Sequence, residues 1–131
     1  MTQATVVKKP TAQIRTQKYA EIAYPLVEDV KNDAKMEAKY RTLALAFPTM
    51  IMQSGLVQAI GFLMAKNEDH HKKILDHLTK LLDHQITPKD LYKKIYKSDI
   101  AEYQLLTRKA IEASGWLKRY AQALLKDDKE K

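Results

Sequence analysis

Residues 42–65, TLALAFPTMIMQSGLVQAIGFLMA, form an uncharged run that is long enough to span a bilayer. Pro48, Gln53, Ser54 and Gln58 interrupt this run, and each polar side chain weakens the case for insertion into a membrane. A helix that is surrounded by other helices is also apolar on all sides. We therefore expect the run to form a buried central helix of a helical domain, with no membrane among the partners of the protein.

The composition of the whole chain also favours helices. Its 131 residues include only 3 glycines and 4 prolines, whereas a sheet-rich fold with many tight turns needs more of both. Hydrophobic residues make up 45% of the chain, which is enough for a core, and the length suits one domain. We predict an all-α, single-domain bundle of about six helices, with an apolar central helix and a long C-terminal helix.

Capping residues set the expected helix boundaries. Asn32 is a suitable cap for the second helix, and Pro48 suits the first turn of the third. Thr87 followed by Pro88 is a strong helix start, and Asp99 repeats this type of cap before the last helix. The expected helices cover about residues 11–30, 33–47, 49–66, 69–82, 88–96 and 99–126.

The helical pattern begins after residue 10 and stops near residue 126. We expect a flexible N-terminal arm over residues 1–10, a helical domain over residues 11–126 and a charged tail over residues 127–131. The arm has no apolar stretch of the kind that a secretory signal requires. The chain also contains no cysteine, which excludes disulfides and agrees with a cytoplasmic location.

Residues with catalytic potential do not form any known enzyme pattern. The three glycines are scattered through helical segments, so there is no phosphate-binding loop, and no serine or threonine lies in a nucleophile elbow. Without cysteine there is no thiolate nucleophile and no thiolate metal site. We predict that the protein is not an enzyme, has no catalytic residues and needs no cofactor.

The histidines raise the possibility of a metal site. Three Asp-His pairs, at residues 69–70, 76–77 and 83–84, repeat every seven residues. Seven residues along a helix rise by about 10 Å, which is too far for two such side chains to bind one ion. Only His70 or His71, joined by a residue of another helix, satisfies the spacing, and nothing identifies that partner. We therefore expect a solvated face and no metal site.

The formal net charge of +7 suggests a polyanionic partner. At 100° per residue, Arg108, Arg119 and Lys126 lie within about 20° of each other on the last helix, beside Gly115. A row of cations next to a residue without a side chain suits a sugar–phosphate backbone. An ordinary solvated face is an equally good interpretation, because Glu112 lies on the same side.

The opposite side of the last helix is the expected core stripe. Its members are Tyr103, Leu106, Ala110, Ser114, Leu117, Ala121 and Leu124. Trp116 falls between the two sides, where it suits either the domain core or a contact between subunits. Stacking of Trp116 on a nucleic-acid base is a less common use of an aromatic residue at helical spacing.

Two segments of the chain resemble those of a known family. The first is FPTMIMQSGLVQA, residues 47–59, and the second combines Tyr103, Thr107 and Ala110 with WLKRYA, residues 116–121. Together they resemble the small helical subunit of the type III-B CRISPR effector, the fifth member of the Cmr module. The likeness in length, basic character and helix number extends over nearly the whole chain.

This resemblance implies a non-catalytic subunit that stacks with further copies of itself into a filament. The other Cmr subunits, the CRISPR RNA and the target RNA are its implied partners, in antiviral defence. The candidate contacts to the RNA backbone are Arg41, Lys66, Arg108, Lys118, Arg119 and Lys126. The candidate packing or interface residues are Gly55, Leu56, Gly61, Trp116 and Leu117. A free-standing, basic helical protein that binds nucleic acid is the alternative.

Overall fold

The computed structural model describes residues 11–127, with side chains from residue 14 onward, and this part of the chain is entirely helical outside its turns. The expected arm at residues 1–10 and residues 128–131 of the expected tail lie outside the described residues. The helices are α1 (Thr11–Val30), α2 (Ala34–Ser54), α3 (Leu56–Lys66), α4 (Asp69–Leu82), α5 (Pro88–Lys97) and α6 (Ile100–Leu124). The prediction of an all-α bundle of six helices is confirmed.

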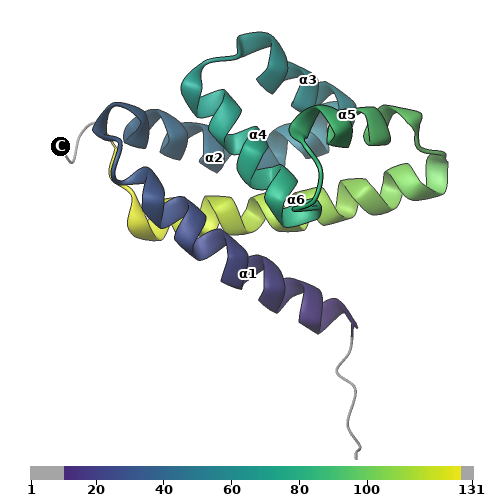
Figure 1. The fold of residues 1–131 in the computed structure, drawn as a ribbon, viewed down its shortest axis with the longest axis horizontal. Coiled ribbons are helices and arrows are strands. Elements are labelled where there is room, and N and C mark those ends of the chain that lie inside the picture. The colour runs from purple at the N-terminus through teal and green to yellow at the C-terminus, as the bar shows by residue number, and fades with distance from the viewer. Residues whose placement is uncertain (1–10, 128–131) are drawn as a thin grey trace, which may run out of the picture.

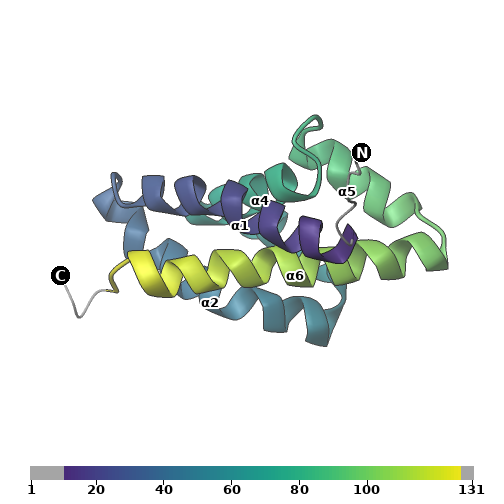
Figure 2. The same cartoon turned by 90° about the horizontal axis from the view of Figure 1, so that it is seen from below.

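The longest helix, α6, extends along one side of the bundle (Figure 1). Seen from below, it passes between α1 and α2 (Figure 2), and it packs against both. α4 packs against all five other helices, whereas α3 packs mainly on α2, α4 and α5. Within residues 11–127, none of these helices combines the length and the apolar character that a membrane span requires.

The boundary that was expected at Pro48 lies instead at Gly55. α2 continues through Pro48 to Ser54, and the chain turns at Gly55, which has φ 88° and ψ 157°. Only glycine adopts this backbone conformation without strain. The apolar run is therefore divided between two helices at Gly55 rather than at Pro48, and it is not buried on all sides. Met52 and Met64 are 61% and 39% exposed.

The remaining caps follow the expected chemistry, with one shift of a single residue. Asp33, and not Asn32, caps α2, because its side chain accepts hydrogen bonds from the backbone N–H groups of Lys35 and Met36. The Thr87 hydroxyl accepts the backbone N–H group of Asp90 in the first turn of α5 at 3.1 Å, and the Asp99 carboxylate accepts that of Glu102 in the first turn of α6 at 2.8 Å. These acceptors satisfy helix N–H groups that lack partners within the helix.

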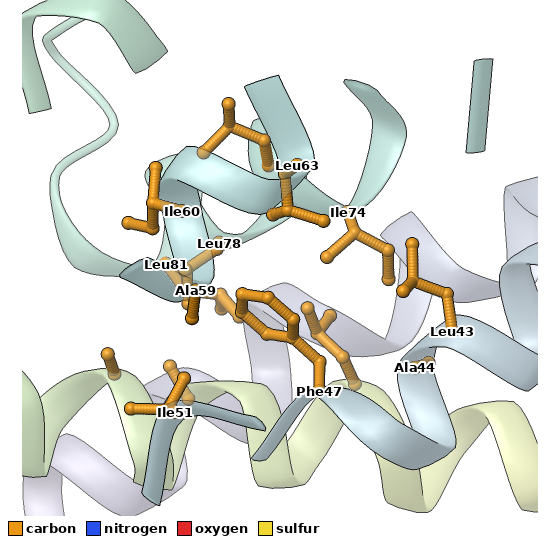
Figure 3. Packing of buried hydrophobic residues seen from close by; sticks show 14 of the residues in the cluster. Leu43, Ala44, Phe47, Ile51, Ala59, Ile60, Leu63, Ile74, Leu78 and Leu81 are labelled. Atoms are coloured by element: carbon orange, nitrogen blue, oxygen red, sulfur yellow. The ribbon is translucent and has the colours of Figure 1, made fainter. Parts of the chain in front are cut away.

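The core is built where the two halves of the apolar run meet α4. Figure 3 shows the ring of Phe47 pointing from α2 toward Ala59 of α3 and toward Ile74 and Leu78 of α4. All four side chains are at most 1% exposed. Burial of a phenylalanine side chain contributes about 1.5–3 kcal/mol to folding, so this contact stabilises the junction of the three helices.

A polar pair lies inside this core. The Tyr40 hydroxyl and Nδ1 of His77 are 2.7 Å apart, and both residues are at most 3% exposed. The expectation of a solvated face is wrong for His77, because contacts with five helices bury more than one stripe of α4. Burial lowers the pKa of His77 to about 4, so the ring is neutral in the folded protein.

We expect Gly55→Ala to lower the free energy of unfolding by about 1–3 kcal/mol, because a Cβ is unfavourable at a φ of 88°. Gly115→Ala is the matched control. It lies inside α6, where a Cβ would meet nothing within 4 Å, and we expect a gain of about 0.5–1 kcal/mol. Urea unfolding of both variants measures the difference, and changes of equal sign would contradict the role of Gly55.

We expect the fold to become less stable as the pH is lowered below neutral. The His77 pKa of about 4 lies below its unfolded value of 6.5, so its stabilising contribution is complete above pH 6.5 and decreases as the unfolded state takes up protons. The full loss, below pH 4, is roughly 3 kcal/mol. Urea unfolding, repeated over a series of acid pH values, measures this loss. In Tyr40→Phe/His77→Leu we expect a shallower loss, with the remainder from His70 and His71, whose pKa values burial also lowers. An unchanged slope would contradict this assignment.

Candidate nucleic-acid interface

The outer side of α6 carries the candidate surface, which we call the α6 strip and define as Arg108, Gly115, Arg119 and Gln122. Arg108, Arg119 and Gln122 are exposed. The two arginines are separated by about 16 Å along the helix axis, because each helical residue rises by 1.5 Å. Among the described residues, neither arginine has a carboxylate within ion-pair distance. Both guanidinium groups are therefore available to an anion from outside the domain.

The acidic residue next to the strip is already paired. Arg15 of α1 donates to the Glu112 carboxylate, with Nε and Nη2 each 3.0 Å from Oε1. The Thr16 hydroxyl donates to the other carboxylate oxygen. Glu112 is half-buried by these contacts, which fasten α1 to α6. The charge that favoured an ordinary solvated face is therefore compensated, and the strip keeps its positive character.

Gly115 leaves the middle of the strip open. A Cβ built at this position would meet no atom of the described residues within 4 Å, so none of their side chains fills the space above the helix. Close helix packing therefore does not explain this glycine. An external chain can approach the backbone of α6 more closely here than beside any residue with a side chain.

The six predicted RNA-contact residues do not form one surface. Lys118 is half-buried, although it is next to Arg119 on α6. Lys66 is the exposed last residue of α3, with Nζ 5.9 Å from the centre of the Phe62 ring. In Figure 1 the turn from α3 to α4 lies at the top of the bundle, whereas α6 extends below. Arg41 of α2 is half-buried, with Nη1 3.9 Å from Asp127.

Lys126 lies two residues beyond the end of α6, so helical periodicity does not place its side chain on the strip. Its position comes from the backbone instead. The N–H group of Lys126 donates to Oε2 of the buried Glu37 at 2.9 Å, and the preceding Leu125 is only 4% exposed. The C-terminal end of the helical domain is therefore fastened to α2, and the exposed Lys126 directly precedes Asp127, the partner of Arg41.

The predicted packing glycines lie against tyrosines. A Cβ at Gly61 would be 3.3 Å from the Tyr92 hydroxyl of α5, and one at Gly55 would be 3.4 Å from the Tyr103 hydroxyl of α6. The Tyr103 hydroxyl also accepts the backbone N–H group of Val57 at 3.2 Å. Leu56, between these features, is completely buried.

The predicted anchors of the last helix lie in different environments. Leu117 is 1% exposed and belongs to the core. Trp116 is half-buried and packs on Tyr120, with the ring centres 5.5 Å apart. Tyr120 in turn contacts Tyr24 of α1 edge-on at 5.2 Å. Trp116 therefore belongs to an aromatic cluster that joins α6 to α1.

A possible metal-binding group lies elsewhere, at the start of α4. Glu68, His70 and His71 bring one ligand atom each to within 4.8 Å of the others. The sequence interpretation required a ligand from another helix, whereas these three residues are local. The sequence did not indicate this group, because His71 was expected on a solvated face of α4. In the structure, His71 is only 6% exposed.

Comparisons with known proteins agree on one family. The model of a family described as CRISPR-associated protein (Cas_Cmr5) matches residues 15–124. A relative named CRISPR system Cmr subunit Cmr5, from Thermus thermophilus, is 33% identical over 115 residues, which are 86% of this chain and 97% of that protein. The crystal structure of a CRISPR-associated Cmr5 family protein from Thermus thermophilus superposes with a TM-score of 0.80 at 30% identity. That match covers 86% of this chain and 97% of the other.

We expect Glu37→Ala to lower the free energy of unfolding by about 1–3 kcal/mol, because the N–H group of Lys126 loses its acceptor. Amide exchange at Lys126 should become faster in the same variant. Glu21→Ala is the control, since Glu21 is exposed on α1, and we expect a change within about 0.5 kcal/mol. Hydrogen exchange combined with urea unfolding tests both, and unchanged exchange at Lys126 would refute the fastening role.

Proposed function

The chain belongs to the Cmr5 family of CRISPR-associated proteins, and from this membership we propose that it is a structural subunit of a CRISPR Cmr effector complex. In this role it makes or breaks no bond. It stacks with further copies of itself into the small-subunit filament and contacts the backbone of the guide RNA–target RNA duplex. The complex acts in antiviral defence in the cytoplasm, and base pairing supplies its sequence specificity.

The observation that carries the RNA contact is the free positive charge of the α6 strip. Arg108 and Arg119 have no acidic partner among the described residues, Glu112 is compensated by Arg15, and the surface above Gly115 is open. Two separated cations flanking a gap match a phosphate backbone better than a compact anion. Such contacts position a nucleic acid without reading its bases.

Exposed apolar side chains support the stacking part of the proposal. Ile100 is 77% exposed and Tyr96 is 55% exposed, and both lie at the turn between α5 and α6. Met52, near the end of α2, is 61% exposed. Large apolar side chains of this kind favour contacts between proteins, because their burial removes apolar area from water. They lie outside the α6 strip, so protein and RNA contacts use different surfaces.

Arg108→Glu/Arg119→Glu should weaken the retention of target RNA by the reconstituted complex at every salt concentration. Because two phosphate contacts are lost, the slope of log K against log salt should decrease by about 2. Filter binding over a salt series measures both effects, and circular dichroism checks that the subunit stays folded. Lys93→Glu/Lys94→Glu is the matched control, because it changes the net charge equally at exposed positions on α5.

Two results would contradict the proposal. If the arginine variant assembles and retains RNA with an unchanged salt slope, the α6 strip does not contact the RNA. If the isolated subunit binds RNA tightly in a gel-shift titration at physiological salt, the free-standing nucleic-acid-binding protein is the better interpretation. A filament subunit should bind weakly alone, because each copy supplies only a few phosphate contacts.

A further inference from the structure

We propose that Glu68, His70 and His71, at the start of α4, form a binding site for a divalent transition-metal ion of the zinc class. Their ligand atoms lie within 4.8 Å of one another. Two imidazole nitrogens and one carboxylate oxygen are a donor set that zinc accepts, with water as a fourth ligand. The site is on α4 and shares no residue with the α6 strip, so it does not depend on the proposed RNA contact.

The three side chains need only a small adjustment to reach coordination distances. Oε1 of Glu68 is 3.9 Å from Nδ1 of His70, and the two imidazole rings have their centres 4.1 Å apart. Ligand atoms in a tetrahedral zinc site are about 3.3 Å apart, so the separations must shorten by up to about 1.5 Å. Glu68 is exposed and makes no capping hydrogen bond, and its carboxylate can therefore rotate toward the histidines.

The environment of His71 is the second observation that indicates a ligand. The ring is 6% exposed, and its Nδ1 has no hydrogen-bond partner among the described residues. Buried polar atoms in proteins normally have a partner, which an ion or its bound water would supply here. The edge-on contact with Phe62, at 5.6 Å between ring centres, holds the imidazole in place. A ligand fixed by packing in this way loses little freedom on binding.

The ligand types of the site, rather than the charges around it, distinguish the class of metal. A hollow of about 430 Å³, lined by Asp33, Lys39, Glu68 and Asp69 among others, gives solvent access to His70. The ammonium group of Lys39 and the positive end of the α4 dipole oppose a cation here, whereas the carboxylates of Asp33 and Asp69 attract one. These charges act alike on any divalent cation, so the preference among metals depends on the two imidazole ligands. This favours zinc over magnesium or calcium, which prefer oxygen ligands.

Calorimetric titration of ZnCl₂ into the full chain, purified without an affinity tag, tests the site. We expect binding of one ion per chain and a melting temperature that rises with zinc concentration, and no effect of MgCl₂. His70→Ala and Glu68→Gln should each weaken zinc binding at least about tenfold. His84→Ala is the matched control, because His84 also follows an aspartate but lies beyond the other end of α4, and this variant should bind zinc like the wild type.

The chain contains only 4 histidines and no cysteine, so few other residues compete for zinc. Of the four, His77 is buried against Tyr40. Glu68→Gln changes an exposed side chain, and circular dichroism confirms that this variant folds. The proposal fails if wild-type protein does not bind zinc, or if Glu68→Gln and His70→Ala bind it as tightly as the wild type. It also fails if His84→Ala loses as much affinity as His70→Ala.

Discussion

The packing of α6 between α1 and α2 depends on the small side chains of its buried stripe. Ala110, Ala113, Ser114 and Ala121 are at most 1% exposed. Helix axes can approach closely where such residues meet, because the distance between two packed helices is set by the side chains at the contact. Larger residues, Leu106 and Leu117, fill the remaining space. With α6 seated in this way, its opposite side is left free for charge, and the α6 strip is a direct consequence of the buried stripe.

Local patterns in the sequence were sufficient to predict most of the helices. The stripe of α6 and the caps Thr87 and Asp99 depend on residues three or four positions apart, which a reader of the sequence can see. Pro48 was misleading for a physical reason. Proline fits the first turn of a helix, but α2 accommodates it internally, and the positive φ of Gly55 makes the actual break. An apolar run without charges does not distinguish these two solutions.

The surroundings of the candidate sites depend on distant contacts, which periodicity does not reveal. Arg15 and Glu112 are 97 residues apart, and Glu37 and Lys126 are 89 apart. The pairing of Glu112 turns a mixed solvated face into a positive one, and the link to Glu37 places Lys126 after the helix has ended. Likewise, His77 is next to an aspartate in the sequence but next to Tyr40 in space. Burial on several sides of α4 is a property of the assembled bundle.

The contact of the first helix with the last has a consequence for folding during synthesis on the ribosome. α1 and α6 pack together, and their aromatic and ionic links join residues near both ends of the chain. At about 5–20 residues per second, the ribosome needs a few seconds to add α6 after α5 is complete. During that interval the part of α2 that packs on α6 has no cover. Until α6 is complete, this apolar surface remains exposed, and exposed apolar surface makes a nascent chain prone to aggregation.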